Sequence, residues 1–272
     1  MENVVVLTGS GCSVGAGGRL MTGKPENNLE CLVLNAVEKC TLDDAARVIL
    51  DWKKKNDFGS GNFEHWLSYL FNASGLSGDP RSPIQSVLWK KDIAPAPQAL
   101  ETLCDLIRKA IFAECALEID RTELPGDKKA QTSGHIPFLA KLVARDATLG
   151  RTHLFTLNYD TLFEQAMEEL GIHYFDGFSG KAYARFDPSI YGLDIYYPGD
   201  VAEGRVRRFD KFLQYYKLHG SIHWRQDSDG TLHARHQDLS FASSYRKGTT
   251  DEKATLLQGE KFQAIPPYGI LP

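Results

Sequence analysis

Glycine and hydroxyl residues follow a short apolar run near the start of the chain, in the stretch "VVVLTGSGCSVGAGG". The run from Val4 to Leu7 is rich in β-branched residues and predicts a buried strand. Glycines directly after a strand leave backbone N–H groups open to the close approach of an anion, because no Cβ stands in the way. The stretch therefore predicts a phosphate-binding loop, and the alternative is a glycine-rich turn that binds nothing.

Two common nucleotide-binding motifs do not fit this loop. The dinucleotide fingerprint G-x-G-x-x-G can begin at Gly9 and Gly11, but Val14 stands where the third glycine should be. The phosphate loop G-x-x-x-x-G-K-[ST] can begin at Gly18, but Pro25 replaces the hydroxyl residue that binds magnesium. A phosphate compound bound here must therefore be held by a different pattern.

Two later strand-like segments also end in polar residues. "THLFT" leads to Asn158 and Asp160, and "FLQYYK" leads to His219. Because the carboxyl ends of parallel strands line one crevice of an open sheet, these side chains should converge with the glycine loop on one ligand. An amide, a carboxylate and an imidazole that titrates near neutrality can position a polar substrate and move a proton.

Each of these three residues also has a structural explanation. Asp160 precedes a helical segment and could cap it. Asn158 could be a turn residue at a strand end, and His219 could bond a backbone group beside a glycine turn. A capping role and a binding role can coexist at Asp160.

Helical periodicity accounts for much of the remaining chain. Apolar positions spaced by three and four predict several helices between Leu29 and Phe71, while "HIPFLAKLVARD" and "TLFEQAMEELG" predict two more, the second ending at Gly171. A further helix has one apolar face, formed by Leu100, Leu103, Ile107 and Ile111. Asp229 and Gly230 predict a hairpin turn between two short strands.

This order of elements predicts an α/β fold with an open parallel sheet. We expect one domain over residues 1–272, with a helical lobe inserted at about residues 29–147 and an irregular segment at about residues 174–212 that lies at the site. The predicted sheet has few strands, and the chain ends in the proline-rich "PPYGILP". We therefore expect the last strands of the domain to be absent from this chain.

Composition narrows the classes of protein. The chain has 272 residues, of which 42% are hydrophobic and 24% charged, and its formal net charge is -4, as in ordinary globular proteins. The sequence has no basic stripe of the kind that indicates direct nucleic-acid binding. It also has no long apolar stretch and no secretion signal, so we expect a cytoplasmic protein. The five cysteines contain no C-x-x-C pair, which predicts neither a disulfide framework nor a zinc site.

The three polar strand ends resemble, in order, three motifs of the sirtuins. "LTGSGCSVGAGG" is similar to G-A-G-x-S, "TLNYDTLFE" to T-Q-N-x-D and "YKLHGSIHW" to H-G. The second and third motifs, with their flanks, are closer to the sirtuin-like NAD hydrolases of bacterial anti-phage defence than to the protein deacylases. The resemblance implies a Rossmann-like sheet of sirtuin type that binds NAD.

The resemblance also implies the residues of the site. Those for NAD binding are Gly9, Ser10, Gly11, Ser13, Asp160 and Gly220. The loop residues would hold the pyrophosphate, and Asp160 would accept a hydrogen bond from the nicotinamide amide. The catalytic residues would be Asn158, which holds the nicotinamide ribose or the attacking water, and His219, the general base at the ribose hydroxyls.

A protein of this branch would consume NAD as its substrate. The products would be nicotinamide and ADP-ribose or a cyclic form, and the loss of NAD would serve anti-phage defence by abortive infection. Two alternatives remain: a catalytically silent subunit that binds NAD or ADP-ribose within a larger assembly, and an NAD-dependent protein deacylase. Deacylases hold a structural zinc with two C-x-x-C pairs after the H-G motif, but no cysteine follows Cys115, so we expect no zinc.

The resemblance implies partners as well. We expect a homo-oligomer and an activating partner protein, such as a DNA translocase or an Argonaute-like protein, because uncontrolled loss of NAD would harm the host cell. The loop after the glycines departs from the deacylase pattern, and the sequence leaves open whether Arg19 contacts a phosphate.

Overall fold

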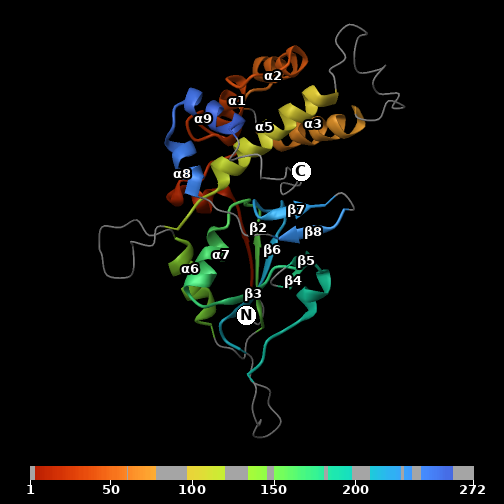
Figure 1. Cartoon of the computed structure of the whole chain (residues 1–272). Coiled ribbons are helices and arrows are strands. Elements are labelled where there is room, and N and C mark those ends of the chain that lie inside the picture. Colours follow the sequence, from red (N-terminus) through yellow and green to blue (C-terminus); the bar gives the residue numbers. More distant parts are fainter. Residues whose placement is uncertain are drawn as a thin grey trace, which may run out of the picture. The chain divides into compact units, whose positions relative to one another are not determined.

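Two compact units make up the computed structural model, which describes residues 4–59, 61–77, 97–119, 134–145, 150–180, 183–197, 209–227, 230–234 and 240–259. The sheet unit draws on Met1–Gly18 and Ala116–Asp238, and the helical unit on Arg19–Cys115 and Leu239–Pro267. Most elements of both are labelled in Figure 1.

A parallel sheet of four strands forms the centre of the sheet unit. In the order β1-β2-β6-β3, the strands are β1 (Val4–Thr8), β2 (Thr152–Thr156), β6 (Phe212–Lys217) and β3 (His173–Phe175). The pairing register places Thr8 beside Thr156 and Thr156 beside Lys217, so three strands end in one row. The predicted α/β fold with a Rossmann-like parallel sheet is confirmed, and β2 and β6 lie side by side in Figure 1.

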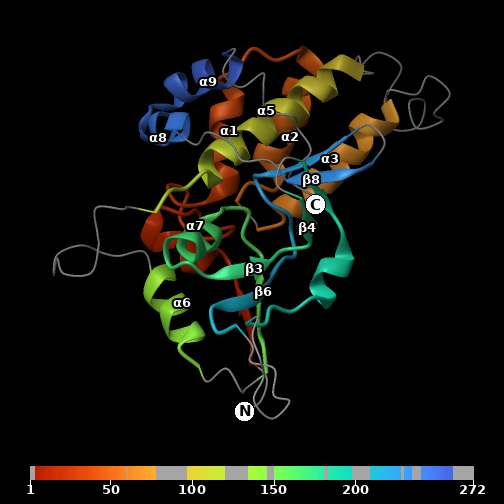
Figure 2. The same cartoon turned by 60° about the horizontal axis from the view of Figure 1, so that its bottom comes forward.

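Two helices cover one face of this sheet, and both confirm predicted helices. They are α6 (His135–Val143) and α7 (Leu162–Glu169), which lie side by side in Figures 1 and 2. Gly171, with φ 63°, follows α7 in the left-handed conformation that glycine adopts at least cost.

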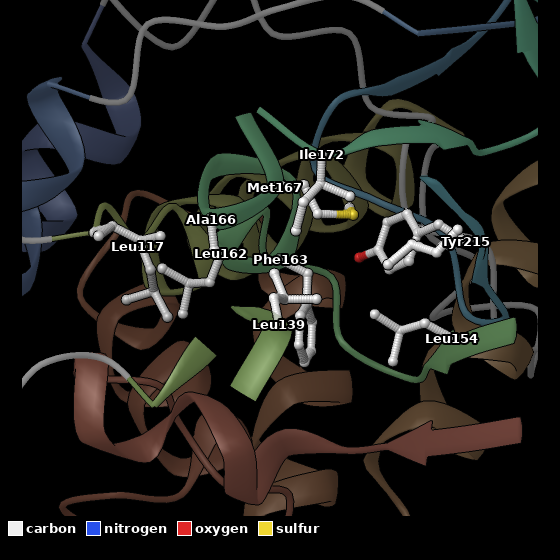
Figure 3. Packing of buried hydrophobic residues seen from close by; sticks show 11 residues of the cluster. Leu117, Leu139, Leu154, Leu162, Phe163, Ala166, Met167, Ile172 and Tyr215 are labelled. Atoms are coloured by element: carbon white, nitrogen blue, oxygen red, sulfur yellow. The ribbon is translucent and has the colours of Figure 1, made fainter. Parts of the chain in front are cut away.

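A single apolar cluster joins α6 and α7 to the strands, and Figure 3 shows its side chains. Leu154 and Tyr215 contribute from β2 and β6, and both are fully buried. The other members of the cluster are Leu117, Ile119, Leu139, Leu162, Phe163, Ala166, Met167, Ile172 and Leu213. This packing fixes the position of the turn between β2 and α7.

A second, antiparallel sheet belongs to the same unit. Its order is β4-β5-β8-β7, formed by β4 (Phe178–Ser179), β5 (Ala184–Phe186), β8 (Leu232–Ala234) and β7 (Trp224–Gln226). The predicted hairpin is the β7–β8 pair, in which Gly230 has φ 85°, while Asp229 lies outside the described residues.

Residues 174–212 differ from the irregular segment that the sequence predicts. Besides most of β3 they contain β4, β5 and the 3-10 helix η2 (Pro188–Gly192), while residues 181–182 and 198–208 lie outside the described part. Strands of two or three residues are too short for an alternating pattern to reveal them.

Six described helices form the helical unit: α1 (Leu29–Glu38), α2 (Asp44–Asn56), α3 (Phe63–Ser77), α5 (Pro97–Cys115), α8 (Ser240–Lys247) and α9 (Thr250–Gln258). Helix α1 packs against α5 and α9, as Figure 2 shows for α1 and α5. The predicted apolar face of α5 is confirmed, since each of its four residues is at most 1% exposed.

The boundaries of the two units differ from those of the helical lobe expected at about residues 29–147. Helix α6 packs against α7 and belongs to the sheet unit, whereas α8 and α9 come much later in the chain and belong to the helical unit. A capping box between Thr249 and Glu252 begins α9, and this T-x-x-E pattern could have revealed that helix in the sequence.

Arg19 lies in an ion cluster of the helical unit. Its Nε is 3.0 Å from Oε2 of Glu114, a fully buried carboxylate whose Oε1 is 2.5 Å from Nζ of Lys253. This pairing accounts for Arg19 without a phosphate. In the part of the chain that the structure describes, no helix has the length and apolar character needed to cross a membrane.

Replacing Leu154 with alanine should lower the free energy of unfolding by about 2–5 kcal/mol, because it leaves a cavity in the cluster behind the sheet. Leu7→Ala is the matched control, since Leu7 lies on the neighbouring strand but is 65% exposed, and it should change that free energy by about 0.5 kcal/mol or less. Urea unfolding of both variants checks this. Equal losses would contradict the assignment of the core.

Candidate functional site

The glycine loop after β1 forms a 3-10 helix, η1 (Ser10–Ala16), instead of an irregular turn. The N–H of Cys12 donates to the carbonyl of Gly9 at 3.0 Å and closes its first turn. Gly17, with φ 86°, ends the helix, and a Cβ on Gly18 would lie 2.7 Å from atoms of Ser13. These two glycines are required by the fold itself.

Gly9 and Gly11 are different, because the described protein gives no reason for them to be glycine. Neither has a φ in the left-handed region, and a Cβ built on either would meet nothing within 4 Å. The space beside them is open. Glycines in such positions suit the close approach of another molecule to the backbone.

The three polar strand ends meet at one edge of the sheet. The row formed by Thr8, Thr156 and Lys217 is extended by two more hydrogen bonds, from the N–H of Leu157 to the carbonyl of Thr8 (3.0 Å) and from the N–H of Leu218 to that of Thr156 (2.9 Å). The glycine loop, Asn158 and His219 follow directly after this row. The topology thus brings together residues from distant parts of the sequence.

Ser13 joins two of these strand ends by hydrogen bonds. Its Oγ donates to Oδ2 of Asp160 at 2.7 Å and accepts from Nδ2 of Asn158 at 2.8 Å. An ionised carboxylate only accepts hydrogen bonds, so the one hydroxyl hydrogen of Ser13 must go to Asp160. The lone pairs that remain on Ser13 can only receive the amide N–H of Asn158, which fixes which way the amide faces.

Asn158 therefore presents its side-chain oxygen away from Ser13. The residue is 6% exposed, its Nδ2 also lies 3.3 Å from Sγ of Cys12, and its Oδ1 has no hydrogen-bond partner among the described residues. A buried amide oxygen without a donor costs about 1–3 kcal/mol. A hydroxyl or water held by a bound molecule would supply the missing donor.

Asp160 has a structural role as well. Its Oδ1 accepts from the N–H of Leu162 at 3.1 Å, at the start of α7, so the capping explanation of this residue holds in part. Both of its oxygens are engaged within the protein, and the residue is 7% exposed. A bond from Asp160 to a nicotinamide amide stays a prediction.

The other residues implied by the sirtuin resemblance differ in exposure. Ser10 is half-buried and Gly11 exposed, whereas Ser13 is 2% exposed and its hydroxyl is engaged. His219 is half-buried, with its ring centroid 6.5 Å from that of Tyr159. Gly220 has φ 89°, a backbone requirement that explains this glycine without a ligand.

His135 is a buried histidine under the electrostatic influence of Asp160, and the sequence analysis did not single it out. It begins α6, is 2% exposed, and packs edge-on against Phe163 with ring centroids 4.6 Å apart. Burial lowers the pKa of His135, and the charge of Asp160 partly opposes this effect. The available signal was a histidine at the start of an otherwise apolar helix face.

No group of three or more potential metal ligands occurs within the described ranges. None of the five cysteines, all of which lie in the described ranges, forms a disulfide bond, and Cys12 is the exposed one. Burial raises the pKa of the Cys12 thiol, so it is a weak nucleophile at neutral pH.

Residues 152–258 match the model of the SIR2-like domain family. The match begins at β2 and contains Asn158, Asp160 and His219, and it supports a sirtuin-like domain with a function related to NAD. The glycine loop lies before the matched residues. A comparison with curated proteins finds no match.

The pKa of His135 should lie below its ordinary value of about 6.5, and Asp160→Asn should lower it further because the opposing charge is lost. The unfolded chain then binds this proton more readily than the folded protein, so His135 reduces the free energy of unfolding as pH falls below about 6.5. NMR titration, with His135→Gln for assignment, measures the pKa. A pKa of His135 that Asp160→Asn leaves unmoved would contradict the electrostatic effect of Asp160 on this histidine.

Proposed function

We propose that this protein hydrolyses NAD at the bond between nicotinamide and ribose and acts in anti-phage defence by depleting NAD. The observation that carries the proposal is Oδ1 of Asn158, which is buried, has no hydrogen-bond partner among the described residues and is held in one orientation by the bond to Ser13 of the glycine loop. Gly9 and Gly11 of the same loop have open space beside them. The SIR2-like match supports NAD as the ligand. The defence role rests on the resemblance of the second and third motifs to defence NAD hydrolases.

The residues of the site suit this substrate. A Cβ on Gly9 or Gly11 would occupy the open space beside the loop. Because glycine has no Cβ, a pyrophosphate has room to lie against the backbone at these two positions. Oδ1 of Asn158 can accept a hydrogen bond from a ribose hydroxyl or from the attacking water. NAD thus satisfies both unexplained features of this edge of the sheet.

Cleavage breaks the bond between the ribose carbon and the nicotinamide nitrogen, whose electron pair leaves with neutral nicotinamide. The oxygen of a water molecule bonds to the same ribose carbon, and one proton is released. Asn158 would hold the water or the ribose, and His219 would accept the proton, a role that suits an imidazole at neutral pH. The products are nicotinamide and ADP-ribose, or a cyclic form where a group of ADP-ribose replaces water.

Assembly and regulation belong to the same proposal. We infer a homo-oligomer in the cytoplasm that a partner protein, such as a DNA translocase or an Argonaute-like protein, switches on. The alternative of a silent subunit that binds NAD or ADP-ribose would need the same glycine loop but not the fixed amide of Asn158. The experiments below separate the two.

Gly11→Ala should weaken ADP-ribose binding by roughly 10–100-fold, because an added methyl group would overpack the bound complex at a cost of about 1–3 kcal/mol. The free energy of unfolding should stay the same or rise by up to about 1 kcal/mol, since the alanine meets nothing in the free protein. Gly15→Ala, in the same 3-10 helix and equally unobstructed, is the matched control. Calorimetric titration that shows equal affinity for both variants would contradict the binding site.

Asn158→Ala and His219→Ala should each lower the rate of nicotinamide release by at least about 100-fold while the protein stays folded. His173→Ala is the control, because His173 is exposed and begins β3 at the opposite edge of the sheet. Chromatography of NAD reactions, with and without candidate partner proteins, measures the release.

Near-normal release by folded Asn158→Ala would refute the assigned roles. Wild-type protein that binds ADP-ribose but releases no nicotinamide under any condition would favour the silent subunit.

A further inference from the structure

A buried lysine lies beneath the candidate site. Lys217 is the last residue of β6, two positions before His219, and it is only 8% exposed. Its Nζ donates to Oε1 of Glu164 at 3.0 Å and to the main-chain oxygen of Asp160. An ammonium group loses much favourable hydration when it is buried, so it is retained only with close partners.

Glu164 holds Lys217 from the side of α7. This carboxylate lies in the first turn of the helix, and its Oε2 accepts from the hydroxyl of Tyr215 at 2.9 Å. Burial raises the pKa of Glu164, and the charge of Lys217 opposes that effect. The nitrogen of Lys217 is thereby anchored on the side of the sheet that faces the apolar cluster, because Tyr215 is part of that cluster.

The carbonyl of Asp160 is the other partner of Lys217, and it lies just outside α7. The helical hydrogen-bond pattern begins one residue later, where the carbonyl of Thr161 accepts from the N–H of Gln165 at 2.9 Å. Lys217 supplies the Asp160 carbonyl with a charged donor. Hydrogen bonds to charged groups are stronger than neutral ones, so this contact restrains the turn before α7.

We propose that Lys217 is a positioning residue for NAD cleavage, an inference that rests on the proposed function. Its ammonium ties the end of β6, which carries His219, to the turn that carries Asn158 and Asp160. Because Asp160 orients Asn158 through Ser13, a displaced turn changes where Oδ1 of Asn158 is presented. Lys217 acts through that turn and not on the substrate.

The test is a double variant, Lys217→Met with Glu164→Gln, which removes both buried charges together and leaves neither unpaired. It should fold and bind ADP-ribose with the stoichiometry of the wild type. Its kcat for nicotinamide release should fall by about 100-fold with KM within about twofold, because misplacing a reacting group by about 1 Å costs about that factor. A second double variant, Lys217→Leu with Glu164→Gln, replaces the first if that one does not fold.

Tyr215→Phe is the matched control. It removes a hydrogen bond from the same carboxylate and perturbs the same core, but it leaves the contact between Lys217 and Asp160 in place. Its kcat should therefore stay within about threefold of the wild type, although its stability falls.

The side-chain amide of Asn158 gives a readout that is independent of turnover. Its ¹⁵N–¹H resonances, assigned with Asn158→Ala, report the bonds to Ser13 and Cys12 and should move in the double variant but not in Tyr215→Phe. If the wild type releases nicotinamide, the proposal requires both the moved resonances and the lower kcat, and the lack of either overturns it. If the wild type releases none, the proposed function fails and the amide resonances alone decide whether Lys217 holds the turn.

Discussion

A hydrogen bond between Ser13 and Asp160 joins the first strand end to the second, and the geometry of the candidate site depends on it. The contact is 2.7 Å long and uses the one hydrogen that Ser13 has to give. The hydroxyl is then left as an acceptor, and Asn158 must turn its NH₂ group toward it. If the series of hydrogen bonds did not end at a charged acceptor, the amide of Asn158 could adopt either of two orientations, because its oxygen and its NH₂ group have similar size and shape.

Four buried polar side chains lie at this one edge of the sheet. Ser13, Asn158, Asp160 and Lys217 are each less than one-tenth exposed, and each makes hydrogen bonds within the protein. Among the side-chain oxygens and nitrogens of these four residues, Oδ1 of Asn158 is the one for which the described part of the chain offers no partner. A buried acceptor without a donor disfavours the free state of a protein, and the hydrogen bonds of the groups around it keep Oδ1 of Asn158 in place.

Sequence patterns predicted most of the longer elements, though not α8 and α9, because helical periodicity is visible in a single chain. They also predicted that the three strand ends meet, because the ends of parallel strands lie at one edge of a sheet. They did not predict the strands β4 and β5, which span only two and three residues. The sequence also did not predict that Ser13 bonds both Asn158 and Asp160. Motifs and topology indicate which segments lie near one another, but not which atoms form hydrogen bonds. In the sequence, Lys217 is only the last residue of a predicted strand. Its burial depends on the carboxylate of Glu164, which belongs to another element.

Both units are discontinuous in the chain, and this has a consequence for biosynthesis. Ser13 and Asp160 are 147 positions apart, and the contact of Cys40 with Ala254 spans 214 positions in the helical unit. Contacts of such long range form slowly and only after the later segment has left the ribosome. A nascent chain therefore carries the glycine loop without its partners from the other strand ends until at least residue 219 has been synthesised, and the buried hydrogen bonds of Ser13 cannot form before Asn158 and Asp160 are present.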